Sequence, residues 1–178
     1  MNILIFGAPG SGESTLGQAL ADATGFFYMD TDDYFWLETP VPYSQRRNTE
    51  EGLSMMLHDI ETHSNCVISG PICGWGDILI PFIDLSVRLN TDTALRIKRI
   101  CEREARLFGH RTDPGGDMHC QFWEFLAAAR QYDTAGHEVR SLAQHMLWEQ
   151  NLICDKMLLD GGNSVTVNVN AIMSRIRP

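Results

Sequence analysis

The stretch that decides the fold follows a short apolar run near the start of the chain and reads Gly7-Ala8-Pro9-Gly10-Ser11-Gly12-Glu13-Ser14-Thr15. Its spacing matches the phosphate-binding pattern G-x-x-x-x-G-K-[ST], except that Glu13 stands where the pattern has lysine. Residues 2–6 predict a buried strand, and apolar residues at helical spacing run from Leu16 until Gly25 offers a stop. The sequence therefore predicts a strand, a glycine-rich turn and a helix in succession.

This glycine-rich turn is suited to an anion. Its glycines allow successive backbone N–H groups to converge on one point, and the start of the helix adds partial positive charge. The Ser14 hydroxyl is placed to bind a magnesium ion. The alternative, a turn without a ligand, is disfavoured by the strand-turn-helix context and by the Ser14-Thr15 pair. We therefore expect residues 7–15 to bind phosphate.

Composition limits the remaining possibilities. The 178 residues fit a single domain spanning 1–178, which is long enough to bury a core. The net charge of −9 argues against a general nucleic-acid or anionic-membrane surface. The five cysteines include no C-x-x-C pair, which disfavours a disulfide framework or a zinc knuckle. The chain starts directly with a core strand and has no apolar run long enough to span a bilayer, so we expect a cytoplasmic protein.

Apolar runs alternate with helical patterns along the rest of the chain. Further strands are predicted at residues 26–29, 66–69, 85–89 and 156–159. Helices are predicted from a cap at Asn48, from a cap at Asn90 or Thr91 to about Leu107, from a cap at Asp117 through Tyr132, from Glu138 to Glu149, and from Val169 to Ile176. This alternation predicts an α/β fold in which a parallel sheet carries helices on both faces and binds ligands at the carboxyl ends of its strands.

Over nearly its whole length the chain resembles the small P-loop kinases, which include shikimate, gluconate and adenylate kinases. The resemblance rests on the loop at 7–15, on Asp30-Thr31-Asp32, on Ser69-Gly70, and on an arginine-rich helix that leads into a lid-like segment. Residues 73–77 and 114–117 look most like bacterial members whose substrates are not established. The resemblance implies a P-loop fold with a five-stranded parallel sheet of order 2-3-1-4-5, and ATP and Mg²⁺ as cofactors. It also implies a lid at about 107–118 and an acceptor-binding region at about 34–63.

Glu13 opposes the charge that such a loop attracts. At an effective dielectric of about 20, a charge pair at about 4 Å is worth about 4 kcal/mol, so exchanging a cation for an anion costs several kcal/mol before relaxation. Three interpretations follow. The replacement is an engineered or chance change in a working kinase, an arginine supplies the missing cation, or the protein no longer transfers phosphate.

Carboxylates gather after the second predicted strand, at Asp30, Asp32 and Asp33. In shikimate kinase the matching D-x-D pair holds magnesium and orients the acceptor hydroxyl. By that similarity Asp30 is the metal-side residue and Asp32 the acceptor-side residue, with Asp33 beside the substrate. The alternative is an aspartate-rich turn that caps the following helix.

Arginines supply the candidate catalytic cations, because phosphoryl transfer depends on positive charge around the moving group. Four of them share one helical face: Arg96, Arg99, Arg103 and Arg106. A solvated, salt-bridged face is an equally good explanation for Arg96 and Arg99. By family position, Arg103, Arg106 and Arg111 are the candidates for triphosphate contacts, and Arg140 is a further candidate in the substrate site.

The acceptor site is expected along the aromatic stretch from Tyr34 to Tyr43. Trp36 can stack on a base or sugar, and Arg46 and Arg47 can grip a carboxylate or phosphate. A nucleoside, a nucleotide or a hydroxy acid would fit, whereas a small core beneath a loop with surface arginines is the alternative. The resemblance adds Trp75 and Asp77 on the substrate side. It also places Gly161 beside the adenine ring, where a simple turn is an equal alternative.

The histidines carry no predicted chemistry. His58, His63, His137 and His145 are interpreted as helix-surface residues. His119 and Cys120 are adjacent, but no complementary pair stands at ligand spacing, so no zinc-type site is expected.

The sequence thus predicts a P-loop kinase fold that binds ATP and Mg²⁺. The expected reaction is transfer of the γ-phosphate to a small hydroxyl or phosphate acceptor, weakened by Glu13. The alternatives are a non-catalytic nucleotide-binding regulatory module and an NTPase that uses no acceptor.

Overall fold

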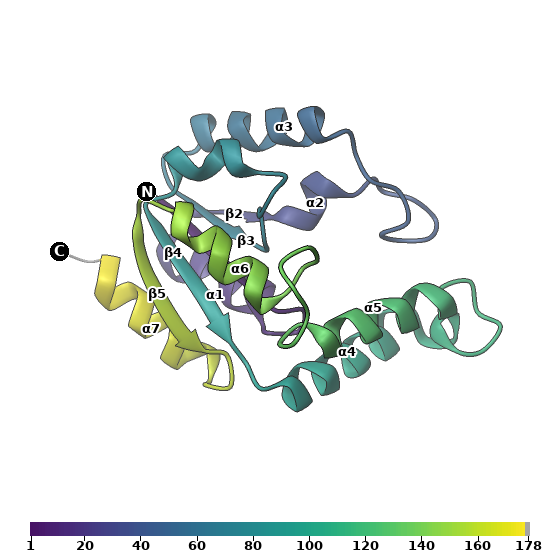
Figure 1. Ribbon diagram of the computed structural model, residues 1–178. Helices are drawn as coiled ribbons and strands as arrows, with labels where there is room; N and C mark the ends of the chain where they lie inside the picture. The colour runs from purple at the N-terminus through teal and green to yellow at the C-terminus, as the bar shows by residue number, and fades with distance from the viewer. Residues whose placement is uncertain (177–178) are drawn as a thin grey trace.

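The computed structural model describes residues 1–176, which form a five-stranded parallel sheet with helices on both faces (Figure 1). The strands are β1 (Asn2–Gly7), β2 (Phe27–Asp30), β3 (Cys66–Ser69), β4 (Leu85–Asn90) and β5 (Asp155–Asp160). Their order is β2-β3-β1-β4-β5, and every neighbouring pair is parallel, which confirms the predicted order. The central β1 has fully buried side chains from Ile3 to Phe6, because it is covered on both faces.

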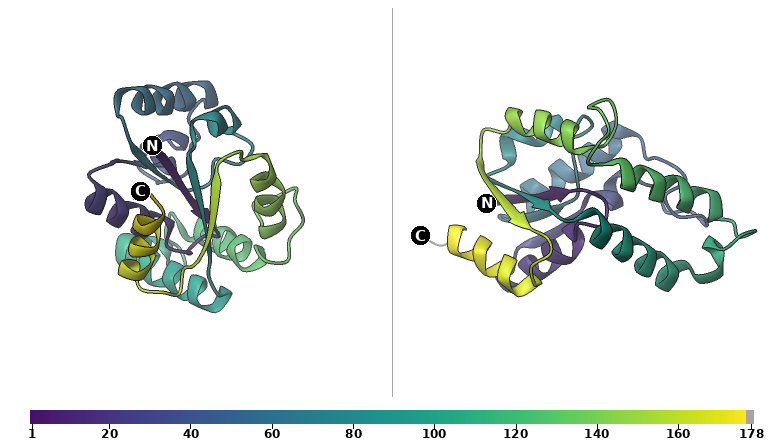
Figure 2. Two further views of the ribbon diagram at one scale, coloured as in Figure 1. Left: turned by 90° about the vertical axis from the view of Figure 1, so that its left-hand side faces the viewer. Right: turned by 60° about the horizontal axis from the view of Figure 1, so that its bottom comes forward.

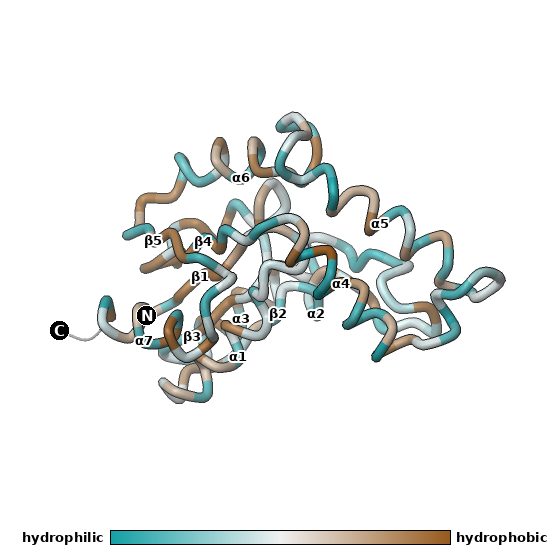
Figure 3. The backbone as a smooth tube through the Cα atoms, turned by 90° about the horizontal axis from the view of Figure 1, so that it is seen from below, coloured by the Kyte–Doolittle hydropathy of each residue, from teal (hydrophilic) through white to brown (hydrophobic). Residues whose placement is uncertain are grey.

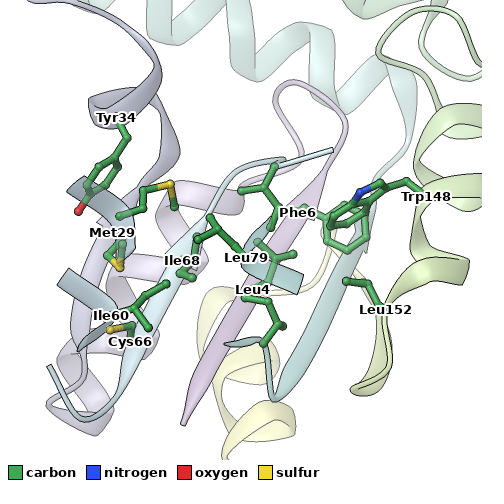
Figure 4. Close-up of a cluster of buried hydrophobic side chains, with 13 residues drawn as sticks. Leu4, Phe6, Met29, Tyr34, Ile60, Cys66, Ile68, Leu79, Trp148 and Leu152 are labelled. Carbon is green, nitrogen blue, oxygen red and sulfur yellow. The ribbon is translucent and has the colours of Figure 1, made fainter. Parts of the chain in front are cut away.

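Alternate residues of the strands build two separate cores. The helices are α1 (Glu13–Thr24), α2 (Thr31–Phe35), α3 (Thr49–Thr62), α4 (Thr93–Phe108), α5 (His119–Gln131), α6 (Leu142–Trp148) and α7 (Val165–Ile176), with short 3₁₀ turns η1 (Asp77–Phe82), η2 (Gly109–Thr112) and η3 (Glu149–Asn151). Ile3 and Ile5 pack with α1 and α7 on one face. Leu4 and Phe6 pack with α3, η1 and α6 on the other (Figures 2 and 4).

Helices α4 and α5 form an arm that extends from the sheet beyond the ends of the strands (Figure 1). Ile100, Leu126 and Ala129 are buried between the two helices. The hydropathy colouring is brown along β1 and β4 and mostly teal or white at the far end of the arm (Figure 3). The arm therefore has a thin apolar seam of its own and contributes little to the two main cores. None of the helices within residues 1–176 is long and apolar enough to cross a membrane.

Several predicted helix starts were wrong. The cap of α4 is Asp92, whose carboxylate accepts from the amides of Ala94 and Leu95 at 2.9 and 3.2 Å, and not Asn90 or Thr91. Helix α5 starts after Met118, because the Asp117 carboxylate is bound by Arg111 and leaves the helix uncapped.

The last two helices also differ from the prediction. Helix α6 is capped by Ser141, which accepts from the Gln144 amide at 3.0 Å, so it starts later than Glu138. Helix α7 begins at Val165, earlier than the predicted Val169. The short helix α2 and the turn η1 were not predicted, because segments of five or six residues carry too little periodicity to be recognised.

The prediction that His145 lies on a helix surface was also wrong. Its side chain is completely buried, its Nδ1 lies 2.8 Å from the Tyr132 hydroxyl, and its ring meets Phe6 edge-on at 5.4 Å. Burial lowers the pKa of His145 to about 3, with further lowering from Arg140 and Arg88, so this imidazole is neutral.

Candidate phosphate-binding site

The turn between β1 and α1 has the geometry of a phosphate-binding loop. Gly10 and Gly12 adopt left-handed conformations, with φ of 79° and 104°, that L side chains rarely take. The Ser11 amide closes the turn on the Ala8 carbonyl at 3.0 Å. The next four amides, of residues 12–15, donate to no protein acceptor within residues 1–176. These amides form the first turn of α1, where the helix dipole also favours an anion.

Buried contacts support this loop from behind. The Ser11 carbonyl accepts from Arg99 Nη1 at 3.1 Å and from the Thr91 hydroxyl at 3.2 Å. Gly161, which follows β5, packs so closely that a Cβ there would collide with the Thr91 hydroxyl and lie 2.6 Å from the Ser11 carbonyl oxygen. A Cβ on Gly10 would lie 2.7 Å from the Arg96 carbonyl oxygen. The loop therefore has its shape before any ligand arrives.

The Glu13 side chain turns into this loop and is almost completely buried. Its Oε1 accepts from the Ser11 hydroxyl at 3.2 Å and lies 3.3 Å from Arg140 Nη2. The same Arg140 nitrogen donates to the Gly7 carbonyl at 3.0 Å. Burial raises the pKa of Glu13 to about 7, although Arg140 and Ser11 lower it and Asp32 and Asp30 add to the rise.

The aspartates after β2 lie beside the start of α1. Asp30 caps α2 by accepting from the Asp32 amide at 3.1 Å, which is the contact that the capping alternative expects. The Tyr28 hydroxyl donates to Asp30 at 3.1 Å and lies 3.4 Å from the Ser14 carbonyl, so it ties the carboxylate to the loop. Burial and the charge of Asp30 raise the pKa of Asp32 and of Asp33.

These oxygen atoms fit a magnesium ion. Ser14 is exposed, and its hydroxyl and the Asp30 carboxylate are the hard ligands that Mg²⁺ prefers. Within residues 1–176 no group of three or more His, Cys, Asp or Glu side chains is arranged to hold a metal by itself. The remaining ligands would therefore be phosphate oxygens and water, as is usual for this ion.

A cleft of about 1550 Å³ opens in front of the loop. It is lined by the loop, Asp30, Asp32 and Asp33, by α4 and α5, and by Arg140 and Gly161. Ligand pockets commonly have volumes of about 300–1000 Å³, so this cleft has room for more than one small ligand.

The arginines of the arm lie in different places. Arg103 and Arg106 line the cleft, and Arg103 binds Glu104 at 2.6 Å. Arg111 does not line it: its guanidinium binds Asp117 at 2.8 and 2.9 Å and donates to the Pro40 carbonyl at 2.7 Å. Arg99, for which a solvated surface position was an equal alternative, touches the loop itself. Helical spacing placed all four arginines of α4 on one stripe but could not show which turn meets Ser11.

Arg96 has a purely structural place. It is completely buried and donates to the Thr91 carbonyl at 3.0 Å, to the Ala129 carbonyl at 3.1 Å and to Asp133 at 2.5 Å. Its contacts join α4 to the end of α5.

The predicted acceptor residues are divided between the cleft and the core. Trp36 and Arg47 line the cleft, and Arg47 is also paired with Glu51 at 2.8 Å. Arg46 does not line the cleft, and its guanidinium lies over the Phe35 and Trp36 rings at 5.2 and 5.9 Å.

Trp75 and Asp77 lie away from the cleft. The Trp75 indole donates to the Pro71 carbonyl at 3.0 Å, and Asp77 accepts from the Trp148 indole at 2.7 Å. Gln121 was missed by the sequence prediction: it lines the cleft and donates to the carbonyls of Pro42 and Tyr43 at 2.9 and 3.2 Å. A lone glutamine on a helix gives no signal that a distant loop will meet it.

No protein-family model matches the chain. The chain is 36% identical to the uncharacterized protein YqaC of Bacillus subtilis (strain 168) over 172 residues, which cover 97% of this chain and 95% of YqaC. The chain belongs to the YqaC family.

Solved structures show which fold this YqaC-family chain has. A shikimate kinase from Bacteroides thetaiotaomicron superimposes with a TM-score of 0.58 and 15% identity, over 99% of this chain and 98% of that one. The shikimate kinase from Acinetobacter baumannii in complex with shikimate gives 0.59 and 14%, over 98% and 92%. The deoxyadenosine kinase from M. mycoides with bound dATP gives 0.55 and 16%, over 99% of each chain. The expected fold of the small P-loop kinases is therefore confirmed.

Proposed function

We propose that this YqaC-family chain binds a magnesium nucleoside triphosphate, preferably ATP, in the loop at 7–15 and passes the terminal phosphoryl group to a small acceptor in the adjoining cleft. The observation that carries the proposal is that the amides of residues 12–15 donate to no acceptor within residues 1–176, and that these residues line the same cleft as Asp30, Asp32 and Asp33. The shared fold supports it, because one neighbour holds dATP and another holds shikimate.

The residues around the loop have complementary roles in this proposal. Ser14 and Asp30 hold the magnesium ion, which neutralises charge on the phosphates when bound. Asp32 receives the proton of the acceptor hydroxyl. Its pKa is raised toward neutral pH, and a general base works best when its pKa lies near the pH of the reaction. Arg103 and Arg106 face the cleft from α4 and stabilise charge on the moving phosphoryl group.

The acceptor is a nucleoside, a nucleotide or a hydroxy acid that lies against Trp36. Its flat or apolar part contacts this ring, and its carboxylate or phosphate meets Arg47, because both side chains line the cleft. Gly161 supports the loop next to the nucleotide.

A second candidate, a nucleotide-binding module that does not catalyse transfer, is favoured by Glu13. This carboxylate occupies the place of the motif lysine and has Asp32 and Asp30 as close negative neighbours. Under this alternative the fold binds nucleotide weakly and signals its presence to a partner.

The test is the affinity for magnesium-ATP, measured by calorimetry, for the wild type, Glu13→Lys and the neutral control Glu13→Gln. We expect Glu13→Lys to bind at least tenfold more tightly than the wild type, because one charge pair at about 4 Å is worth about 4 kcal/mol at an effective dielectric of about 20, and a tenfold change in affinity requires only about 1.4 kcal/mol. ADP release is then followed with nucleosides, nucleotides and hydroxy acids as acceptors. Transfer by Glu13→Lys supports the kinase, binding without transfer by any of the three proteins supports the module, and absence of binding in all three contradicts both.

A further inference from the structure

Arg140 reaches the phosphate loop from a different direction than the arginines of α4. It lies in the connection between α5 and α6, 133 positions from Gly7 along the chain, and its Nη2 contacts both the Gly7 carbonyl and the Glu13 carboxylate. Its charge also lowers the pKa of Asp32, as expected for a cation near the acceptor-side aspartate. Arg140 is thus the cation closest to the position where the motif has lysine.

Three of the other four arginines near the cleft are bound to groups other than Glu13. Arg103 forms an ion pair with the nearly buried Glu104, and Arg111 forms one with Asp117 outside the cleft. Arg99 donates to the Ser11 carbonyl and supports the loop from α4. Arg106 lines the cleft two turns farther along α4 than Arg99. None of these four contacts Glu13 within the described part of the chain.

The guanidinium of Arg140 keeps donors available for a ligand. Arginine carries five N–H donors in a planar fork that matches phosphate oxygens. Within residues 1–176 the recorded hydrogen bonds of Arg140 use only Nη2, and its side chain is 40% exposed on the cleft wall. Nε and Nη1 can therefore donate to a phosphate while Nη2 stays on Gly7.

From these contacts we infer that Arg140 is the phosphate-binding cation of this loop, in place of the motif lysine, and that Glu13 holds its guanidinium at the loop until a triphosphate binds. This inference rests on the proposed function and assigns Arg140 to the triphosphate rather than to the acceptor. Glu13 is suited to this task because its carboxylate is held in turn by the Ser11 hydroxyl. When the phosphate arrives, its oxygens replace the carboxylate as acceptors for the Arg140 fork.

The experiment is a double-mutant cycle on magnesium-ATP affinity, measured by calorimetry. Its members are the wild type, Arg140→Gln, Glu13→Lys and the double variant Glu13→Lys/Arg140→Gln. If Arg140 replaces the lysine, Arg140→Gln weakens binding at least tenfold in the wild-type background and less than threefold in the Glu13→Lys background. Arg140→Lys keeps the charge and recovers at least half of the lost binding free energy. Arg103→Gln, which removes a cleft arginine paired with Glu104, changes affinity equally in both backgrounds and serves as the matched control.

Three outcomes overturn the inference. They are equal losses from Arg140→Gln in both backgrounds, no loss in the wild-type background, and binding by Glu13→Lys alone with none by the wild type. If neither the wild type nor Glu13→Lys binds, the proposed nucleotide function itself fails, and this result is distinct from the other three. Thermal unfolding of each variant, recorded without ligand, separates lost binding from lost folding.

Discussion

The loop at residues 7–15 packs against the start of α4, whereas the predicted lid at about 107–118 lies at its other end, and the two segments are held differently. At the start of α4, the completely buried Arg96 and the buried Thr91 fix the backbone around the loop. At its end, Arg111 of the predicted lid and Gln121 of α5 donate to the carbonyls of Pro40, Pro42 and Tyr43, through contacts that are largely exposed to solvent. Buried charged groups that lose a partner are costly, whereas exposed ion pairs add little to stability. We therefore expect the loop to keep its shape before a ligand binds, and the predicted lid to open more easily.

The largest expected effect on stability concerns the buried contacts at the start of α4. Arg96→Met leaves the Ala129 carbonyl and the Asp133 carboxylate without their buried partner, so we expect the free energy of unfolding to fall by about 3–5 kcal/mol. Urea denaturation measures the loss. Arg99→Met is the matched control from the same helix face, and it should cost less stability but weaken phosphate binding through Ser11. Equal losses for the two variants would show that burial does not distinguish these arginines.

A smaller effect on stability is expected from the titration of Glu13 in the loop. The folded pKa of Glu13 is about 7 against an ordinary value of 4.5, so between these two pH values the folded protein keeps a proton that the unfolded chain releases. Glu13 therefore destabilises the fold progressively as pH rises from 4.5 to 7, by about 3 kcal/mol in total, since one pKa unit corresponds to about 1.36 kcal/mol.

Glu13→Gln removes this titration. We expect the free energy of unfolding of the variant, minus that of the wild type, to be larger at pH 8 than at pH 4.5 by about 3 kcal/mol. Denaturation at several pH values measures this difference, in which the titrations of His145 and the other shared groups cancel. A difference that does not change with pH would mean that the Arg140 pair keeps Glu13 ionised throughout.

The smallest effect on stability is expected for the exposed contacts of the predicted lid. Arg111→Gln removes the exposed pair with Asp117 and the bond to Pro40, so the global stability should change little. Amide hydrogen exchange should nevertheless become faster in residues 36–47 and 109–118, while the loop at 7–15 keeps its protection. Faster exchange in the loop as well would show that the predicted lid and the loop open together, and would contradict the expectation that they are held independently.

Local pattern was enough to predict the framework of this protein. Each strand of the sheet was predicted within a residue or two, because runs of apolar residues and the glycine-rich motif are properties of adjacent positions. The sheet order came from the resemblance to small P-loop kinases, which TM-scores of 0.55 to 0.59 support at identities of 14 to 16%. Helix starts were less accurate, because neighbouring polar residues such as Asn90, Thr91 and Asp92 can all cap a helix, and a candidate such as Asp117 can be bound by another partner instead.

The sequence by itself determined a strand-loop-helix unit with an acidic residue in the lysine position. Only the tertiary structure decided where the long polar side chains go. A helical repeat assigns Arg96 and Arg99 to one face, yet burial separates a structural residue from one that supports the loop. Likewise, Arg140 contacts Gly7 and His145 packs against Phe6, although most of the sequence separates the two residues of each pair. A polar side chain is placed by the partners that satisfy its hydrogen bonds, and those partners are brought together only when the sheet and its helices pack.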